Sequence, residues 1–311
     1  MSHPLRYLEP GSFWFVTSRC IDARFLLRPD PALTALAGFC LARAARRFEG
    51  ISLHGVIFMS NHFHLIVCDR DSELSDFMCA FNGMFAKAVN ALRGRRGHVF
   101  ARRFSAERIL DEPAKMERLL YLTLNPVAAN LVERHDDWLG LSLRSQTGEP
   151  EEHRYRYFNE GKFKVARLAA IRDGVPLPKR SDFEDEEILV VQPLLPAATA
   201  ADRQVMAQQI EETIRAREQE KREANGSTKS RPLGMRRVLD QNPEHAPSDP
   251  KQSPQPLCHA STWETWKHFK ALMRQIHALY VEASAAFRSG QFDITFPPHT
   301  FRPPGPLAAL G

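Results

Sequence analysis

Residues 52–68 read SLHGVIFMSNHFHLIVC, and this stretch contains two apolar runs rich in β-branched residues. The runs, 52–58 and 62–68, are separated only by residues 59–61. Each run has the length and composition that are typical of a strand, and so short a connection favours antiparallel pairing. The sequence therefore predicts a β-hairpin, and the rest of the N-terminal region is interpreted around it.

The second run of this hairpin carries two histidines at alternate positions. His62 and His64 share one face of the strand and Phe63 points to the other, because successive side chains of a strand alternate. Two imidazoles side by side supply half of a metal site. The alternative is a chance pair on an edge strand with no metal-binding role, and the spacing alone leaves both interpretations open.

Strand-like and helix-like patterns alternate over the first part of the chain. The expected strands are 12–18, 52–58, 62–68 and 105–110, and the expected helices are 31–48, 74–92 and a third that begins at Pro113 and ends near Asn125. The order β-α-β-β-α-β-α is that of the split βαβ, or ferredoxin-like, arrangement. We therefore expect an α+β fold in which a four-stranded antiparallel sheet has its helices on one face.

The periodic signal weakens after this region. Residues 1–140 are expected to form the first domain, 141–240 a charged helical extension, 241–260 a linker, and 261–311 an amphipathic helix with a proline-rich tail. The extension is thus expected to be mainly helical and partly disordered. The last helix carries Trp263 and Trp266, and it either packs on the first domain or forms the face of a homodimer.

The overall composition excludes several classes of protein. The chain has 311 residues, 43% hydrophobic and 25% charged, which is ordinary for a globular protein. It has no apolar run of the ~20 residues that a membrane helix needs and no signal-peptide pattern, so we expect a soluble, cytoplasmic protein without a membrane partner. The five cysteines include no CxxC pair, which argues against a disulfide framework and a zinc ribbon.

One segment is strongly basic, although the net charge of the chain is only +5. Between Lys87 and Arg108 there are seven basic residues and one acidic residue, with aromatic and imidazole rings between them. Cations on phosphates beside rings that stack on unpaired bases are typical of proteins that bind single-stranded or hairpin nucleic acid. The candidate nucleic-acid-binding residues are Arg93, Arg95, Arg96, Arg102, Arg103 and Phe104. The alternative is a solvated loop without a ligand.

Three motifs, in order, resemble those of one enzyme family. FMSNHFHLIV (58–67) is similar to the MPNHxHLLV signature of the single-tyrosine HUH transposases, and more closely of the bacterial REP-associated tyrosine transposases. GHVFARRFSAERILD (97–111) is similar to the stretch before the family's last strand, and YLTLNPVAANLV (121–132) resembles its YIHLNPVRAGLV. Ser60 stands for the usual proline, and Ala128 stands for the usual arginine, one candidate phosphate contact.

The resemblance implies an enzyme that cuts and rejoins single-stranded or hairpin DNA through a 5′-phosphotyrosine. It implies Tyr121 as the nucleophile, and Asn125, four residues later, as a metal ligand beside His62 and His64. The residue types suit these roles, because a phenol forms a phosphate ester, and two imidazoles with an amide oxygen accept Mg²⁺ or Mn²⁺, although histidine also accepts Zn²⁺. The implied setting is the nucleoid of a bacterial cytoplasm.

Other interpretations stay open. Tyr121 is otherwise a core aromatic of an amphipathic helix, and Asn125 a helix-end residue ahead of a proline. For the whole protein, one alternative is a DNA-hairpin-binding regulator that does not cleave, and another is an HUH nuclease of plasmid replication or conjugation. The intact pair of histidines and Tyr121 argue against the regulator, and the short core with a single candidate tyrosine argues against the replication nuclease.

Overall fold

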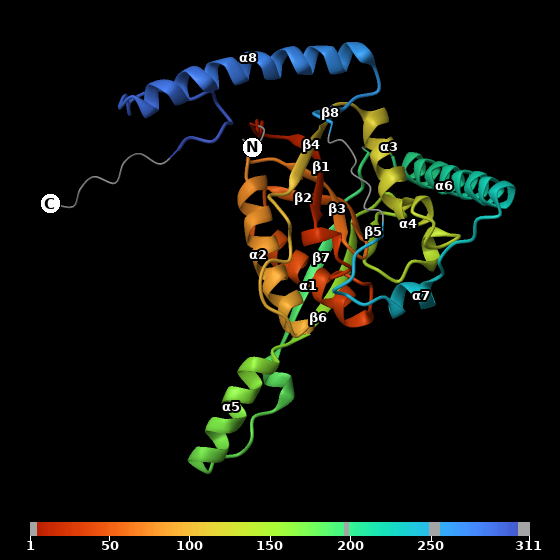
Figure 1. Cartoon of the computed structure of the whole chain (residues 1–311), viewed down its shortest axis with the longest axis vertical. Coiled ribbons are helices and arrows are strands. Elements are labelled where there is room, and N and C mark those ends of the chain that lie inside the picture. Colours follow the sequence, from red (N-terminus) through yellow and green to blue (C-terminus); the bar gives the residue numbers. More distant parts are fainter. Residues whose placement is uncertain (1–4, 196–198, 249–255, 304–311) are drawn as a thin grey trace.

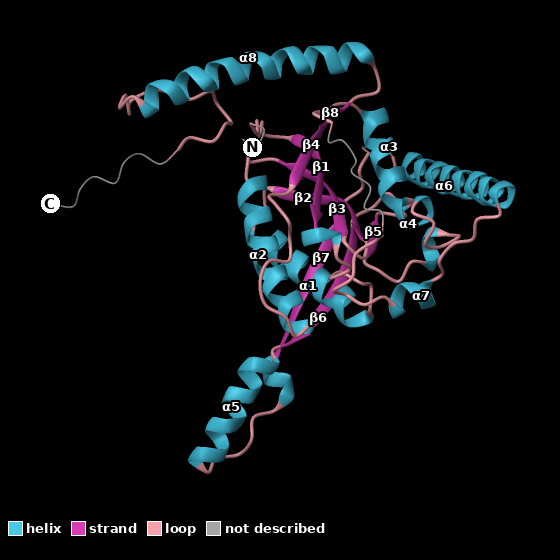
Figure 2. Cartoon of the chain, in the orientation of Figure 1, coloured by secondary structure: helices cyan, strands magenta, loops and turns pink. Residues whose placement is uncertain are grey.

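The chain folds around one mixed β-sheet with helices on both of its faces (Figure 1). The structure is a computed structural model that describes residues 5–195, 199–248 and 256–303. Within these residues the eight-stranded sheet has the order β6-β7-β2-β3-β1-β4-β8, and β5 also pairs with β2. The strands are β1 (Ser12–Arg19), β2 (Ile51–Phe58), β3 (His62–Asp69), β4 (Ser105–Ile109), β5 (Ser142–Arg144), β6 (Glu151–Phe158), β7 (Glu184–Val191) and β8 (Cys258–His259). The helices, cyan in Figure 2, are α1 (Pro31–Arg47), α2 (Leu74–Leu92), α3 (Glu112–Thr123), α4 (Asn125–Ala128), α5 (Glu160–Asp173), α6 (Ala200–Thr228), α7 (Met235–Asp240) and α8 (Trp263–Arg288).

The four central strands are those that the sequence predicts. β1 pairs antiparallel with β3 and β4, and β2 pairs antiparallel with β3. The β2–β3 hairpin is closed by the backbone N–H of Met59, which donates to the carbonyl of His62 at 2.8 Å. The expected α+β class is confirmed.

The expectation of a four-stranded sheet is wrong, because further strands join its edges. β6 and β7 form an antiparallel hairpin, and β7 is linked to β2 by a parallel pairing of Val191 with Leu53. β5 pairs with β2, and β8 pairs parallel with β4. The charged extension is therefore helical in α5, α6 and α7 but also supplies strands. β7 begins with an acidic run, and only its alternate residues, Glu187, Leu189 and Val191, are buried.

The expectation of helices on one face is also wrong. α1 and α2 cover the face to which Phe63, Leu65 and Val67 of β3 point, whereas α3, α4 and α6 cover the face to which Ile66 points. Strand alternation gives both faces apolar residues, so both need a cover. At Gly55 of β2 a Cβ would lie 3.3 Å from side chains of β3 and α3, so the glycine allows α3 to pack closely on the sheet.

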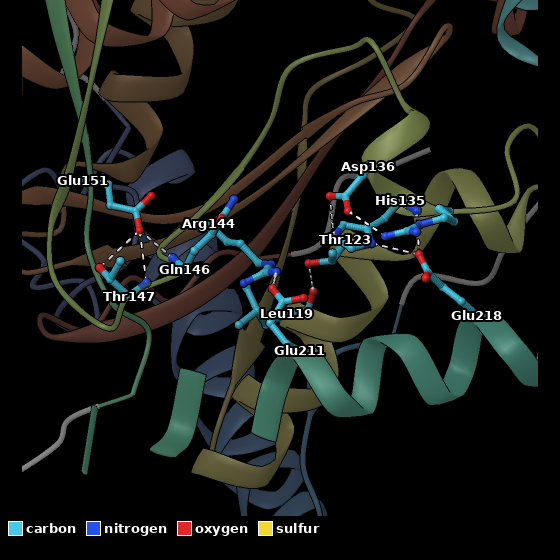
Figure 3. Close-up of polar contacts among 11 residues, drawn as sticks. Leu119, Thr123, His135, Asp136, Arg144, Gln146, Thr147, Glu151, Glu211 and Glu218 are labelled. Carbon is cyan, nitrogen blue, oxygen red and sulfur yellow. Dashed lines mark hydrogen bonds and ion pairs between the residues drawn. The ribbon is translucent and has the colours of Figure 1, made fainter. Parts of the chain in front are cut away.

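Two carboxylates, one of them buried, fix α6 against the rest of the protein (Figure 3). Glu218 is 2% exposed and accepts hydrogen bonds from the backbone N–H of His135 at 2.6 Å and from its Nδ1 at 2.8 Å. Glu211 pairs with the buried Arg144 of β5, and Ile214 of the same helix is fully buried. This long charged helix therefore packs against α3 and holds it in place.

Part of the predicted linker also lies against the core. The backbone N–H of Phe25 donates to the carbonyl of His245 at 2.8 Å, and Glu244 pairs with Arg24 at 2.8 Å and with Arg95 at 3.0 Å. The rest of the linker, residues 249–255, and most of the proline-rich tail, residues 304–311, lie outside the described residues. The disorder expected there and the domain boundaries stay predictions.

Two elements project from the compact part of the chain. α5, with the β6–β7 hairpin that carries it, extends from one end of the sheet, and α8 crosses the opposite end (Figure 1). None of the helices in the described residues combines the length and apolar character that a membrane span requires.

Glu187 ties the added strand β7 to α1. Its side chain accepts hydrogen bonds at 2.9 Å from Nε of Arg43 and at 2.9 Å from Nε of Arg46. Burial acts to raise the pKa of Glu187, but the hydrogen bonds from Arg46 and Arg43 outweigh it, and the pKa lies below its usual value. A carboxylate with a lowered pKa stabilises the fold above its unfolded pKa, and this stability is lost as the pH falls through the folded pKa.

We predict that Glu187→Gln lowers the free energy of unfolding by ~1–2 kcal/mol at neutral pH, because a buried, charge-assisted link is lost while its arginines stay hydrated. The difference from wild type should shrink toward pH ~3. Urea unfolding at both pH values measures it. Glu186→Gln is the control, because Glu186 is an exposed neighbour paired with the exposed Arg156. An equal loss of unfolding free energy in the two variants would contradict the stabilising role of Glu187.

Candidate functional site

His62 and His64 lie on the sheet face that α3 covers. Their ring centroids are 4.8 Å apart, and the ring of Phe15 stacks on His64 at 4.8 Å. Tyr121 of α3 lies edge-on to this group, with its ring centroid 5.7 Å from those of both Phe15 and His64. The structure thus brings Tyr121 and the histidine pair, which are far apart in sequence, into one cluster around Phe15.

Each histidine ring is held through its Nδ1 atom. Oγ1 of Thr17, which faces His64 across the β1–β3 pairing, lies 2.7 Å from Nδ1 of His64 in a hydrogen bond. Nδ1 of His62 donates to Oδ1 of Asn61 at 2.7 Å, which leaves the lone pair of its ring on Nε2. Nε2 of His64 is buried and has no hydrogen-bond partner in the described part of the chain. A buried nitrogen without a protein partner calls for an explanation, and a role as a metal ligand is one.

Both rings are kept neutral. Burial, with Arg19 adding to it, lowers the pKa of His62 to about 3. Burial also lowers the pKa of His64 well below its usual value, with His62, Arg19 and Arg118 acting in the same direction. A neutral imidazole is the form that binds metal ions.

The residues present fit a metal ion that also binds substrate. The unpartnered Nε2 of His64 and the free Nε2 lone pair of His62 are two donors. The described residues contain no group of three or more His, Cys, Asp or Glu side chains that could hold a metal ion. Asn125 begins α4 with 7% of its surface exposed, and it makes no hydrogen bond to either histidine in the described chain. Any further ligands would therefore be Asn125, water, or phosphate oxygens.

Tyr121 is presented to solvent and lies beside a cation. It is 42% exposed, whereas its neighbours Leu120 and Leu122 are buried, so it is not a core aromatic. The guanidinium carbon of Arg118, one turn earlier on α3, is 4.9 Å from the centre of the Tyr121 ring. Burial lowers the pKa of Arg118, with opposing contributions from Tyr121, Glu107 and Glu117.

A carboxylate and imidazole pair, which the sequence did not point to, borders the same cluster. Nε2 of His259 in β8 donates to Oε2 of Glu107 in β4 at 2.8 Å, and Glu107 is 8% exposed. The ring of His259 meets Phe15 edge-on at 5.8 Å. Glu107 and His259 are 152 residues apart, so no local motif could reveal the pair, whereas Arg118 could have been found from its helical spacing to Tyr121.

The basic loop contains both half-buried arginines that contact other parts of the chain and exposed arginines. Arg93 donates to the Asp30 carboxylate at 2.5 Å and to the carbonyl of Arg28 at 3.0 Å. Arg95 pairs with Glu244 at 3.0 Å and donates to Asn90 at 2.8 Å. These contacts hold the loop to the core.

The remaining predicted residues of the loop also differ from one another. Phe104 is 7% exposed, and its ring is covered by the guanidinium of Arg6 at 3.5 Å, so a base could not stack on that face in this conformation. Arg96, Arg102 and Arg103 are exposed. The surface of the loop that is open to a ligand is therefore smaller than the sequence suggested.

No protein-family model and no curated protein matches the chain. Among solved structures, it is similar to a REP-associated tyrosine transposase bound to a REP hairpin, with 20% identity, a TM-score of 0.39, and coverage of 44% of this chain and 80% of that one. It is also similar to the tRNA(His) guanylyltransferase of Saccharomyces cerevisiae, with 8% identity, a TM-score of 0.33, and coverage of 43% of this chain and 66% of that one. At these TM-scores neither similarity identifies the family of this chain.

Proposed function

We propose that the chain is a metal-dependent transposase, an enzyme that cleaves and rejoins single-stranded or hairpin DNA. The observation that carries the proposal is the exposed ring of Tyr121, 5.7 Å from the ring of His64, whose buried Nε2 has no partner among the described residues. A purely structural histidine would have its buried nitrogens satisfied, and a purely structural tyrosine would be packed. An exposed phenol over two neutral imidazoles instead has the parts of a phosphodiester-cleaving site.

Tyr121 would act as the nucleophile. Its Oη bonds to the phosphorus of the scissile phosphodiester as the phenol loses its proton, the bond from phosphorus to O3′ breaks, and the leaving 3′-oxygen gains a proton. The products are a 5′-phosphotyrosine and a free 3′-hydroxyl, and attack by a later 3′-hydroxyl reverses the step without ATP. The guanidinium of Arg118 would stabilise negative charge on Oη as it attacks or leaves.

His62 and His64 would hold Mg²⁺ or Mn²⁺, with Asn125 as a proposed further ligand. Bound there, the metal ion would polarise the non-bridging phosphate oxygens and favour attack. Thr17 and Asn61 would orient the two rings, because each hydrogen-bonds to Nδ1 and leaves Nε2 to the metal.

The exposed arginines of the basic loop would contact the DNA backbone. Arg96, Arg102 and Arg103 are the exposed members of the predicted set, and phosphate contacts by such cations supply affinity without sequence preference. Arg93, Arg95 and Phe104 would instead shape the loop.

We predict that Tyr121→Phe abolishes covalent adduct formation and lowers cleavage at least ~1000-fold, because only the attacking oxygen is removed. DNA binding and stability should stay unchanged. The measurement is an SDS-resistant adduct between the protein and labelled hairpin DNA in Mn²⁺. Tyr157→Phe, remote from the site, is the control and should keep the adduct. If wild type binds hairpins tightly but forms no adduct, the protein is the non-cleaving regulator.

Removal of either histidine should abolish metal-dependent cleavage and leave hairpin binding largely intact. Thr17→Val should lower the affinity of the site for the metal ion about 10–100-fold, because the His64 ring loses its orienting hydrogen bond. High Mn²⁺ concentrations should therefore restore cleavage by this variant. Cleavage rates across a Mn²⁺ titration measure both effects. His268→Ala, an exposed histidine on α8, is the control. Cleavage by His64→Ala with an unchanged Mn²⁺ dependence would contradict the ligand assignment.

The two groups of loop arginines should behave differently. Arg96→Ala with Arg102→Ala should leave stability unchanged but flatten the log–log salt dependence of binding by ~0.7 per lost phosphate contact on single strands. Arg93→Ala should instead lower the free energy of unfolding by ~1–3 kcal/mol, because Asp30 loses the shorter of its two arginine contacts and the carbonyl of Arg28 loses a donor. Binding at several salt concentrations and urea unfolding separate the two effects. A wild-type salt slope in the double variant would mean that the DNA path avoids this loop.

A further inference from the structure

The carboxylate and imidazole pair of Glu107 and His259 has no part in the cleavage step described above. Glu107 of β4 lies opposite Phe15 of β1, and residues opposite each other in antiparallel strands share a face of the sheet. β8, which carries His259, pairs with the other edge of β4. Just after β8, the backbone N–H of Ser261 donates at 2.8 Å to the carboxylate of Asp111, which caps α3. The pair is therefore fixed on the sheet face that α3 covers, close to the helix that carries the proposed nucleophile.

The hydrogen bond between the two side chains decides which nitrogen of His259 can accept a proton. Nε2 lies 2.8 Å from Oε2 of Glu107. An ionised carboxylate only accepts hydrogen bonds, so the proton of the neutral ring is on Nε2 and the lone pair is on Nδ1. Within the described ranges of the chain, Nδ1 makes no hydrogen bond. The side chain of His259 is 14% exposed, so solvent still reaches the ring. The ring thus has a free acceptor atom, while its donor atom is held.

Tyr121 and the Glu107–His259 pair lie around the same aromatic ring and the same guanidinium group. The rings of Tyr121 and His259 both meet Phe15 edge-on, with centroids 5.7 Å and 5.8 Å from that of Phe15. The guanidinium carbon of Arg118 lies 4.9 Å from the centre of the Tyr121 ring and 5.8 Å from that of Phe15. Burial lowers the pKa of Arg118, and the negative charges that Tyr121 and Glu107 can carry oppose this effect. The phenol and the carboxylate are therefore both close to this one cation.

The other basic side chains of the cluster are not suited to accept a proton from the phenol. Nδ1 of His62 and Nδ1 of His64 are each engaged in a hydrogen bond, and their Nε2 atoms are the proposed metal donors. Arg118 keeps its charge at neutral pH, because a guanidinium group in a protein does not release its proton. His259 is the basic group that these constraints leave at the border of the cluster.

We propose that the Glu107–His259 pair exchanges the proton of Tyr121 during cleavage and rejoining, directly or through one water molecule. This inference rests on the proposed function. In cleavage, the O–H bond of the phenol breaks as Oη bonds to phosphorus, and the proton moves to Nδ1 of His259. The leaving 3′-oxygen takes its proton from water. Glu107 acts as a positioning residue, since it holds the imidazole in the accepting tautomer and stabilises the imidazolium ion that forms. In rejoining, Nδ1 returns the proton to Oη as the bond from Oη to phosphorus breaks.

The test follows the rate of adduct formation with labelled hairpin DNA in saturating Mn²⁺ over a range of pH. His259→Gln should lower this rate about 100-fold or more, which is the usual contribution of a general base. For wild type, the logarithm of the rate should rise with pH and then level off, because only the neutral imidazole accepts a proton. This rise should be absent in His259→Gln. The control is His268→Gln, the same change at an exposed histidine of α8.

The ionisable groups around the imidazole must be considered when this pH profile is interpreted. They are Glu107 on β4, Arg118 and Tyr121 on α3, and Asp111 at the start of α3. Glu107→Gln keeps a hydrogen-bonding group of the same shape but removes the negative charge that favours the imidazolium ion. We therefore expect this variant also to lower the rate, and it tests the proposal where His259→Gln lowers stability.

A tyrosine analogue separates proton transfer from a structural effect. Difluorotyrosine in place of Tyr121 has a more acidic phenol, which needs less help from a base. It should therefore restore most of the rate that His259→Gln or Glu107→Gln loses. If the pair only docked β8 onto β4, the analogue would restore nothing. Thermal unfolding and hairpin affinity are measured for each variant, and hairpin affinity should stay unchanged.

The outcomes separate this inference from the proposed function. If wild type and His259→Gln form the adduct at the same rate, the proposed function stands and the assignment of the proton acceptor is overturned. The assignment is also overturned if His259→Gln keeps the rise in rate with pH, or if difluorotyrosine restores no activity to either variant. If wild type forms no adduct at any pH, the proposed function fails, and the role of the Glu107–His259 pair fails with it.

Discussion

The division of β3 between two faces is the constraint on which the rest of the structure depends. Phe63, Leu65 and Val67 point into the core under α1 and α2, and His62 and His64 point with Ile66 toward α3. A shift of the strand by one residue would place both imidazoles in an apolar core and three large apolar side chains on the other face. The burial of the apolar residues therefore fixes the direction in which the histidines point, and in this way the hydrophobic core positions the site.

The helix that carries Tyr121 is positioned from two sides. Toward the sheet, Leu122 packs beside Gly55, where a Cβ would lie only 3.3 Å from its side chain. On its other side, α6 is anchored by the buried carboxylate of Glu218, which accepts two hydrogen bonds from His135. The side chain of Tyr121 is exposed while the helix that carries it is packed on both sides, so the phenol is held on a rigid element, as the proposed nucleophile would require.

What the sequence could predict depended on local pattern. The hairpin at 52–68, the shared face of His62 and His64 and the helices α1 and α2 follow from periodicity, because burial on one side imposes it. The strand β7 did not stand out, because its acidic start has the composition of a solvated segment and the arginines that neutralise Glu187 lie on α1. The same limit applies to the basic loop, since Arg93 meets Asp30 and Arg95 meets Glu244, carboxylates that only the fold brings near.

The C-terminal segment is part of the site region rather than an appendage to it. β8 pairs with only two residues of β4, yet it places His259 against the buried Glu107. Without that imidazole, Glu107 would be a carboxylate in a mostly buried position without its hydrogen-bond partner, which is costly. The β4 edge and the border of the cluster around Phe15 therefore share one dependence, because each is complete only when β8 packs against it. A fragment that ends after α3 would lose the imidazole partner of Glu107 and, with it, one side of the cluster around Phe15.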